Sequence, residues 1–173
     1  RRPHAGRSAL VALVNDDGTV STSFQPNPNG AVSALVSLAN GGTLVGGNFT
    51  AIAGATRNRL ARLDNANGLD TGYAPNFNGA VNALAVQSDA RALVLVGGSF
   101  TTVNGTARAN LARLLPDGST DATFAPTVGV VRALVLQGDG KILVLQDGSG
   151  VRTLVSRLNA DGSADATFTA FNG

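Results

Sequence analysis

The chain of 173 residues is built from a unit that repeats at a spacing near fifty residues. The marker Gly-Gly-x-Phe-Thr begins at Gly46 and again at Gly97, and the marker Leu-Ala-Arg-Leu begins at Leu60 and again at Leu111, in both cases 51 residues later. A weaker third copy of the second marker begins at Val155, a further 44 residues along the chain. A fixed period of this length indicates one supersecondary unit that is copied and that buries its apolar faces on its neighbours.

Each unit contains short apolar runs separated by turn sequences. In the third unit the runs cover 130–136, 141–145 and 153–158, and a short fourth run follows at 163–168. Asp-Gly or Asn-Gly stands between many of the runs, which predicts antiparallel hairpins closed by two-residue turns. Several runs are apolar at successive positions, so both faces of those strands must be covered. Stacked four-stranded sheets provide that cover, which favours the blades of a β-propeller.

The repeat therefore predicts an all-β fold, a β-propeller-like repeat array of about three and a half four-stranded antiparallel blades. The absence of Met, even at position 1, predicts that the chain begins inside a longer gene product. The expected parts are a basic tail or processing remnant at 1–7, a half blade holding third and fourth strands at 8–24, blades at 25–73, 74–124 and 125–168, and the start of a further unit at 169–173.

Three stretches carry a resemblance to a known family: Val-Gly-Gly-Ser-Phe at 96–100, Gly-Asp-Gly-Lys at 138–141 and Asp-Gly-Ser-Ala-Asp-Ala-Thr-Phe at 161–168. With them the unit resembles the bacterial delta-sixty repeats, which are propeller-type modules. The third unit departs from that pattern, because Gln146 to Ser149 stand where Gly-Gly-x-Phe is expected. The resemblance implies a propeller-type fold and a secreted or cell-surface location, and it implies no activity.

Composition excludes several kinds of chemistry. The chain has no Cys, so it can form neither disulfides nor thiolate metal sites, and its one His is His4, in the expected tail. Catalysis that needs a histidine base therefore has no internal candidate. The loop holding Asn159, Asp161 and Asp165 lacks the terminal bidentate carboxylate of a calcium site. We expect no enzymatic activity, no metal and no cofactor.

Charge and hydropathy exclude two kinds of partner. The net charge is only +2, and the one dense basic stretch, Arg1 to Arg7, lies in the expected tail. A phosphate-binding surface needs cations clustered on one face, so we expect no nucleic-acid binding. No apolar run approaches the ~20 residues of a membrane helix, so we expect no membrane span.

Arginine and aspartate recur in phase with the repeat. In each unit a second Arg follows a first by five residues and an Asp follows that second Arg by eight. One interpretation is a ring of arginines that binds anions; the other, which the repetition favours, is a structural ion pair in every blade. Two sequons fit N-glycosylation, at Asn48 and Asn104. The predicted ion pairs are Arg62 with Asp70, Arg113 with Asp121 and Arg157 with Asp165.

The uncharged run at 9–14 reads as an edge strand, of the kind that recruits another chain. We therefore expect a non-enzymatic, secreted or cell-surface structural protein that self-associates through blade faces and edge strands into a ring or a filament. The alternative is a propeller-type binding module that recognises a glycan or a protein through inter-blade loops, with Asn27, Asn29, Asn76 and Asn78 gathered at one rim. A third hypothesis is part of a hydrolase whose catalytic residues lie in further blades.

Overall fold

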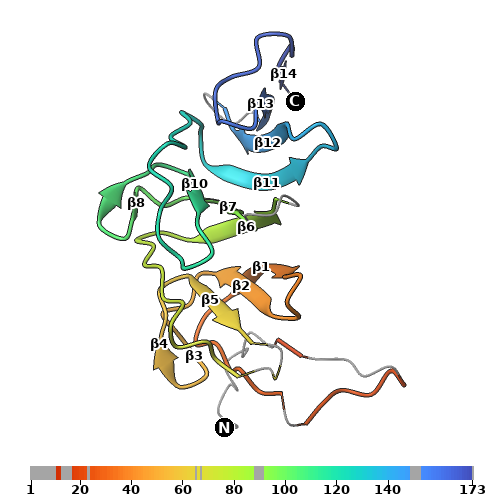
Figure 1. Cartoon of the computed structure of the whole chain (residues 1–173), viewed down its shortest axis with the longest axis vertical. Helices are drawn as coiled ribbons and strands as arrows, with labels where there is room; N and C mark the ends of the chain where they lie inside the picture. Colours follow the sequence, from red (N-terminus) through yellow and green to blue (C-terminus); the bar gives the residue numbers. More distant parts are fainter. Residues whose placement is uncertain are drawn as a thin grey trace, which may run out of the picture.

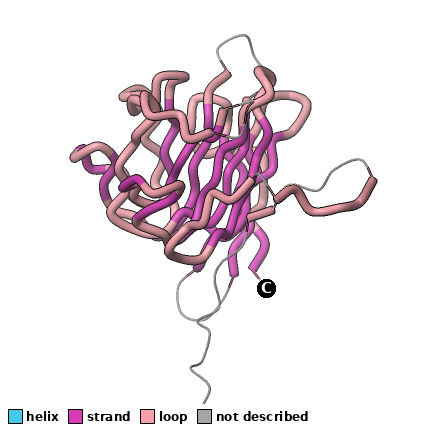
Figure 2. The backbone as a smooth tube through the Cα atoms, turned by 90° about the horizontal axis from the view of Figure 1, so that it is seen from below, coloured by secondary structure: helices cyan, strands magenta, loops and turns pink. Residues whose placement is uncertain are grey.

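The computed structural model describes residues 11–12, 17–22, 24–64, 66, 68–87, 92–148 and 153–172. Regular structure within these residues consists of β-strands alone, as the ribbon and the tube both show (Figures 1 and 2). The all-β, propeller-like fold predicted from the repeat is thus confirmed. No helix long and apolar enough to span a bilayer occurs among the described residues.

Three antiparallel sheets lie one after another along the long axis of the molecule (Figure 1). The first has the order β1-β2-β5, the second β6-β7-β10, and the third β11-β12-β13-β14. Short hairpins, β3 with β4 and β8 with β9, project from the first and second units. The bounds are β1 Val32–Ser37, β2 Thr43–Gly47, β3 Ala51–Ile52, β4 Ala55–Thr56, β5 Leu60–Leu63, β6 Val81–Val86, β7 Val94–Gly98, β8 Thr102–Val103, β9 Thr106–Ala107, β10 Leu111–Leu114, β11 Val131–Leu136, β12 Ile142–Asp147, β13 Thr153–Leu158 and β14 Phe171–Asn172.

The fourth run of each unit differs in detail from the expected fourth strand. It forms a single bridge to the third strand, as between Leu114 and Thr120. The chain then turns, because the Asp121 carboxylate accepts hydrogen bonds from both the amide and the hydroxyl of Thr123. In the third sheet the fourth position is occupied instead by β14, which pairs with β13.

The hairpin turns also differ from the expected two-residue type. Leu115 accepts a hydrogen bond from the amide of Gly118 and donates its own amide to Ser119, so the loop has three residues and Gly118 has a φ of 88°. This is a type I turn that ends in a left-handed glycine. The two-residue type occurs in the short hairpins, where Asn104 and Gly105 both have positive φ.

Each Gly-Gly pair allows two different close approaches. A Cβ on Gly46 would overlap the side chain of Val81 on the next sheet, whereas a Cβ on Gly47 would overlap the main-chain oxygen of Ala31 in its own sheet. Gly97 and Gly98 repeat both relations in the second sheet. The first glycine therefore lets neighbouring sheets nest, and the second lets the backbone close at the bulge in the first strand.

Most of the hydrophobic core lies between the sheets, and a third cluster with Phe24, Val45 and Phe49 covers the outer face of the first sheet. One buried cluster joins Leu44 and Leu60 of the first sheet to Val94 and Val96 of the second, and another joins Leu95 of the second sheet to Val144 of the third. Strands that are apolar at successive positions have two apolar faces, and this stacking covers both of them.

We predict that Gly98→Ala lowers the free energy of unfolding by about 2–4 kcal/mol, since the added methyl group meets backbone that cannot move aside as a side chain can. Gly138→Ala is the matched control: a Cβ there meets no atom within 4 Å, and the change should stay within about 0.5 kcal/mol. Urea denaturation followed by circular dichroism measures both. Equal stability of the two variants would contradict the assigned role of Gly98.

Candidate functional site

An arginine on the third strand of a sheet links its own unit to the next one. In the second sheet, Arg113 Nε donates to Asp121 Oδ2 at 2.8 Å, and Arg113 Nη2 lies 2.8 Å from the same oxygen. Arg113 Nη1 donates to the main-chain oxygen of Ala160 at 2.8 Å, in the turn of the third unit. One guanidinium therefore binds both the carboxylate of its own unit and a main-chain carbonyl of the next unit.

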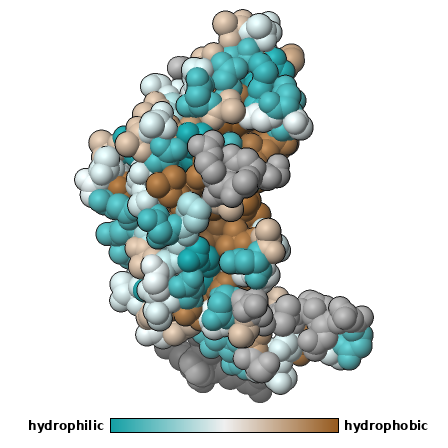
Figure 3. All heavy atoms as spheres, viewed as in Figure 1, coloured by the Kyte–Doolittle hydropathy of each residue, from teal (hydrophilic) through white to brown (hydrophobic). Residues whose placement is uncertain are grey.

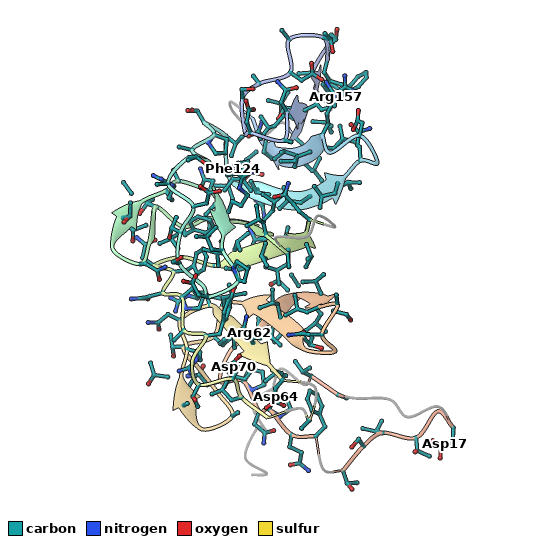
Figure 4. The ribbon with its side chains drawn as sticks, viewed as in Figure 1. Asp17, Arg62, Asp64, Asp70, Phe124 and Arg157 are labelled. Atoms are coloured by element: carbon teal, nitrogen blue, oxygen red, sulfur yellow. The ribbon has the colours of Figure 1, made fainter. Side chains whose placement is uncertain are left out.

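The first sheet repeats this arrangement. Arg62 Nε donates to Asp70 Oδ2 at 2.8 Å, and Arg62 Nη1 donates to the main-chain oxygen of Pro116 at 2.7 Å (Figure 4). The structure thus brings together the Arg and Asp that the sequence pairs at a spacing of eight. It also adds a contact between units, and this contact uses a backbone atom.

An aromatic ring lies beneath each of these guanidinium groups. The Cζ atoms of Arg62, Arg113 and Arg157 lie 4.1, 4.5 and 4.8 Å from ring centroids. Two of the rings also lie close to a turn glycine of the next unit; a Cβ on Gly162 would lie 2.9 Å from two atoms of the Phe124 ring. Cation–π contacts of this kind contribute about 0.5–2 kcal/mol, more when desolvated. The three rings are Tyr73, Phe124 and Phe168.

We call the set of Arg, Asp, aromatic ring and facing turn the interblade clamp. It is complete at the first junction, with Arg62, Asp70, Tyr73 and the turn holding Pro116 and Gly118. At the second it consists of Arg113, Asp121, Phe124 and the turn holding Ala160 and Gly162.

The third unit holds a modified copy. Arg157 Nε donates to Asp165 Oδ2 at 2.6 Å, and Lys141 Nζ donates to the same oxygen at 2.8 Å. Phe168 is half-buried, whereas Phe124 is fully buried beneath the following turn. The third unit therefore carries the Arg, Asp and ring of a clamp, with an additional cation from Lys141.

Burial and hydrogen bonding act in opposite directions on the three aspartates. Burial raises the pKa of the Asp121 carboxyl, but hydrogen bonds from Thr123 and Arg113 outweigh it and hold that pKa below its usual range. Burial and Arg62 compete in the same way at Asp70, whose pKa is also lowered. Hydrogen bonds from Lys141 and then Thr167 hold the pKa of Asp165 far below its usual range.

The other arginines in phase with the repeat bind main-chain carbonyls. Arg57 donates to the oxygens of Thr56 and Thr71, and Arg108 donates to those of Ala107 and Ala122. Their partners lie within their own units, so these arginines hold loops rather than form a ring open to anions. Arg152, the third of this series, lies outside the described residues.

Of the four loop asparagines proposed for ligand recognition, Asn29 and Asn78 are used inside the fold, and Asn76 Oδ1 accepts a hydrogen bond from Asn58 Nδ2. Asn29 Oδ1 accepts from the amides of Thr50 and Ala51, and Asn29 Nδ2 donates to Thr50 Oγ1 at 2.9 Å. Asn78 makes the same three bonds around Thr101. These side chains brace the loop before the first strand against the Gly-Gly-x-Phe-Thr segment, which explains the threonine in that marker.

The two sequon asparagines have different surroundings. Both are exposed, but Asn104 accepts from the amide of Asn76 and donates to the oxygen of Gly118 at 3.1 Å. Asn104 thus has a structural role in the second unit, where it opens the β8–β9 turn. Glycosylation at Asn48 and Asn104 stays a prediction.

The described residues contain no group of three or more His, Cys, Asp or Glu side chains that could hold a metal ion. In the loop considered for calcium, Asp161 Oδ1 accepts from the amide and the hydroxyl of Ser163, and Asp165 binds Arg157 and Lys141. These carboxylates are occupied by turn and ion-pair contacts.

Sequence reasoning missed two parts of the interblade clamp. The rings follow their arginines by eleven residues in all three units, so this spacing could have revealed them. The contact to Pro116 or Ala160 has no such signal, because any residue supplies a main-chain oxygen.

We predict that Arg113→Ala lowers the free energy of unfolding by about 3–5 kcal/mol, because Asp121 is left charged and buried without its partner. Arg113→Lys should recover only part of this loss, since an ammonium cannot make the same fork of contacts. The control is Arg132→Ala, which breaks an ion pair whose side chains are 58% and 42% exposed and should cost at most about 1 kcal/mol. Chemical denaturation of the three variants measures these losses in the free energy of unfolding. Similar losses for Arg113→Ala and Arg132→Ala would contradict the role of the clamp.

The lowered aspartate pKa values predict that the fold loses stability at acidic pH. An Asp whose folded pKa lies below the unfolded value of about 3.9 stabilises the fold above that value, and the contribution is lost as pH falls through the folded pKa. The melting temperature should be nearly constant from about pH 7 to 5 and should fall below about pH 4. Asp121→Asn should melt lower at pH 7 and lose less on acidification. A wild-type melting temperature that rises below pH 4 would contradict this prediction.

One comparison with known proteins gives a match. The family model described as "Domain of unknown function (DUF5122) beta-propeller" matches residues 38–71, 94–124 and 137–168, which together are more than half of the chain. No curated protein and no solved structure matches.

Proposed function

Since the chain belongs to this DUF5122 beta-propeller family, we propose that it is a structural protein, without enzymatic activity, that self-associates through its blade faces and edge strands. A propeller domain of this kind is a binding or structural module. The closer assignment to delta-sixty repeats, and with it a secreted or cell-surface location, is part of the proposal and rests on the sequence stretches at 96–100, 138–141 and 161–168.

The observation that carries the proposal is the exposure of core-type residues on the two outermost sheets. Leu35 on β1 is 54% exposed, although its equivalents, Leu84 and Leu134, pack into the two junctions between sheets. Val135 on β11 is 56% exposed, although its equivalent in the first sheet, Val36, packs against the first core cluster. Leu35 and Val135 thus leave exposed, one at each end of the stack, a side chain of the kind that the internal junctions cover, while Val45 on the same face as Leu35 is buried in a third cluster with Phe24 and Phe49.

Polar groups at the two ends support the same proposal. The turn Asp17-Gly18-Thr19 has the bonds of the internal turns: Asp17 Oδ1 accepts from the amide and hydroxyl of Thr19, and Gly18 has a φ of 81°. Among the described residues, no atom lies within 4 Å of a Cβ built on Gly18. At the other end, the third unit carries Arg157 and the half-buried Phe168. A second copy can therefore offer a turn to a ring, as neighbouring units do.

The proposal includes no active site because the charged groups of the chain repeat at equivalent positions in each unit. The strongest electrostatic feature, the interblade clamp, recurs at equivalent positions, and its carboxylates are occupied by arginine. Catalysis requires groups in different roles around one reacting atom, which a repeated ion pair does not provide. The edge strand expected at 9–14 lies mostly outside the described residues, so the proposal does not depend on it.

We predict concentration-dependent association of the wild-type chain, measured by sedimentation velocity between 1 and 100 µM at low salt (about 50 mM). In a head-to-tail assembly, either Leu35→Asp or Val135→Asp alone should return the chain to a monomer, because every interface joins the Leu35 face of one copy to the Val135 face of another. In a pairing of like faces, only one of the two substitutions should matter.

The control is Thr56→Asp, which places the same charge on an exposed position of β4 and should leave association unchanged. A wild-type chain that remains a monodisperse monomer at 100 µM would refute the proposal. Electron microscopy of the associated fraction distinguishes a ring from a filament.

A further inference from the structure

The interblade clamp of the third unit is incomplete in the part of the chain that the structure describes. In both complete clamps, Nη1 of the arginine donates to a main-chain oxygen of the next unit. Arg157 Nε and Nη2 bind Asp165 and Thr167, but Arg157 Nη1 has no hydrogen bond to any described residue. The ring of Phe168 is in edge contact with Phe171, which is itself 64% exposed. The incomplete clamp therefore has a free hydrogen-bond donor and a ring that is only partly covered.

A turn that matches the missing part lies at the other end of the molecule. Asp17 stands at the tip of an arm, residues 17–22, that projects away from the sheets (Figures 1 and 4). The tip of the arm has a hydrophilic surface (Figure 3). Its turn has the Asp hydrogen bonds and the left-handed glycine of the two turns that complete the internal clamps. Gly18 is therefore already in the conformation in which Gly118 and Gly162 lie close to a ring.

The charges of the arm and of the incomplete clamp are complementary. Lys141 adds a cation to the third clamp, at a position where the first two units have an uncharged residue. The arm has an additional acid, since Asp16 precedes Asp17 where the turns of the internal clamps have Pro or Ala. The clamp thus has one positive charge more than its internal counterparts, and the turn has one negative charge more. Charges of opposite sign orient two surfaces that meet and favour their encounter.

The sheets themselves fit less well at this end of the stack. At the internal junctions, Gly46 and Gly97 make room for a valine of the next sheet. In the third sheet Leu145 has the same place in the strand pairing, so that nesting is not repeated there. The clamp is therefore the part of an internal junction that this end retains.

We propose that the arm of one copy docks on the incomplete clamp of another, so that Gly18 packs against Phe168 and Arg157 Nη1 donates to a main-chain oxygen of the turn. This inference rests on the proposed self-association and names the segments that make the contact. The arm and the incomplete clamp lie at opposite ends of one chain, so the contact is head-to-tail and can repeat from copy to copy.

A spin label on the arm tests where it docks. The chain has no Cys, so a cysteine introduced by Thr22→Cys, at an exposed position of the arm, takes a nitroxide at one place. The labelled chain is mixed with ¹⁵N-labelled wild type at low salt. Docking should broaden the amide signals of residues 157–168 of the wild-type chain. The signals of the hairpin at 51–56, in the first unit, should stay unchanged.

A glycine substitution tests the packing. Gly18→Asn keeps the left-handed conformation accessible and enters open space among the described residues of the single chain. Against a ring, its Cβ would meet the overlap calculated for Gly162, so the Kd for association should rise about tenfold or more. Gly54→Asn is the matched control: Gly54 has a φ of 75° and equally open surroundings, and this variant should associate as the wild type does.

A charge substitution tests the complementarity. Lys141→Gln keeps the length of the side chain but removes the additional cation, and Arg157 still pairs with Asp165. The Kd for association should rise about two- to fivefold at low salt, the value of one exposed ion pair. At high salt, about 500 mM, the variant and the wild type should associate equally.

Two results would overturn the inference while leaving self-association in place. One is association of the wild type with broadening confined to residues outside the third unit. The other is equal association of Gly18→Asn and Gly54→Asn. A wild-type chain that does not associate at all refutes the proposed function itself, and this inference with it.

Discussion

Each sheet of this molecule is apolar on both faces, and the need to cover both faces is the constraint on which the rest of the structure depends. A lone sheet of three or four short strands cannot meet it. The sheets therefore stack, and two of the three buried clusters lie between them, while the third covers the outer face of the first sheet. The glycines of the Gly-Gly pairs serve the same need, because Gly46 and Gly97 let a valine of the next sheet approach.

Apolar cover alone leaves the spacing and orientation of the sheets loosely defined, and the interblade clamp restricts both. A guanidinium that binds its own aspartate, lies over its own ring and reaches the carbonyl of the next turn has few arrangements open to it. A glycine of that turn also packs closely against the ring. Hydrogen bonds are directional where hydrophobic contact is not, so the clamp adds geometry to the cohesion that the core supplies.

Much of the fold could be read from the sequence because the repeat multiplies a weak signal. The sheets form where runs such as 93–96 and 142–145 are apolar at successive positions, and the fixed spacing from Arg113 to Asp121 recurs in every unit. The hairpins β3–β4 and β8–β9 have strands of two residues, too short for any periodicity to show. The contacts from arginine to the next unit are made to main-chain oxygens, which every residue type has, so no sequence pattern marks them. The loop asparagines Asn29 and Asn78 suggested recognition, but their amides are used to brace the fold.

The third unit departs from the others in a way that bears on how such a chain can lengthen over evolutionary time. Strand pairing places Leu145 where the first two sheets have Gly46 and Gly97, so the hollow that receives a neighbour's valine has a leucine at its position. A unit that packs after this one, whether duplicated in tandem or supplied by a second copy, would bring a valine of its first strand against Leu145 and could not reproduce the fit seen at Gly46 and Gly97. Expansion of the gene at that point would require a compensating change to a smaller side chain, whereas duplication of the first or second unit would preserve a fitting partner on each side.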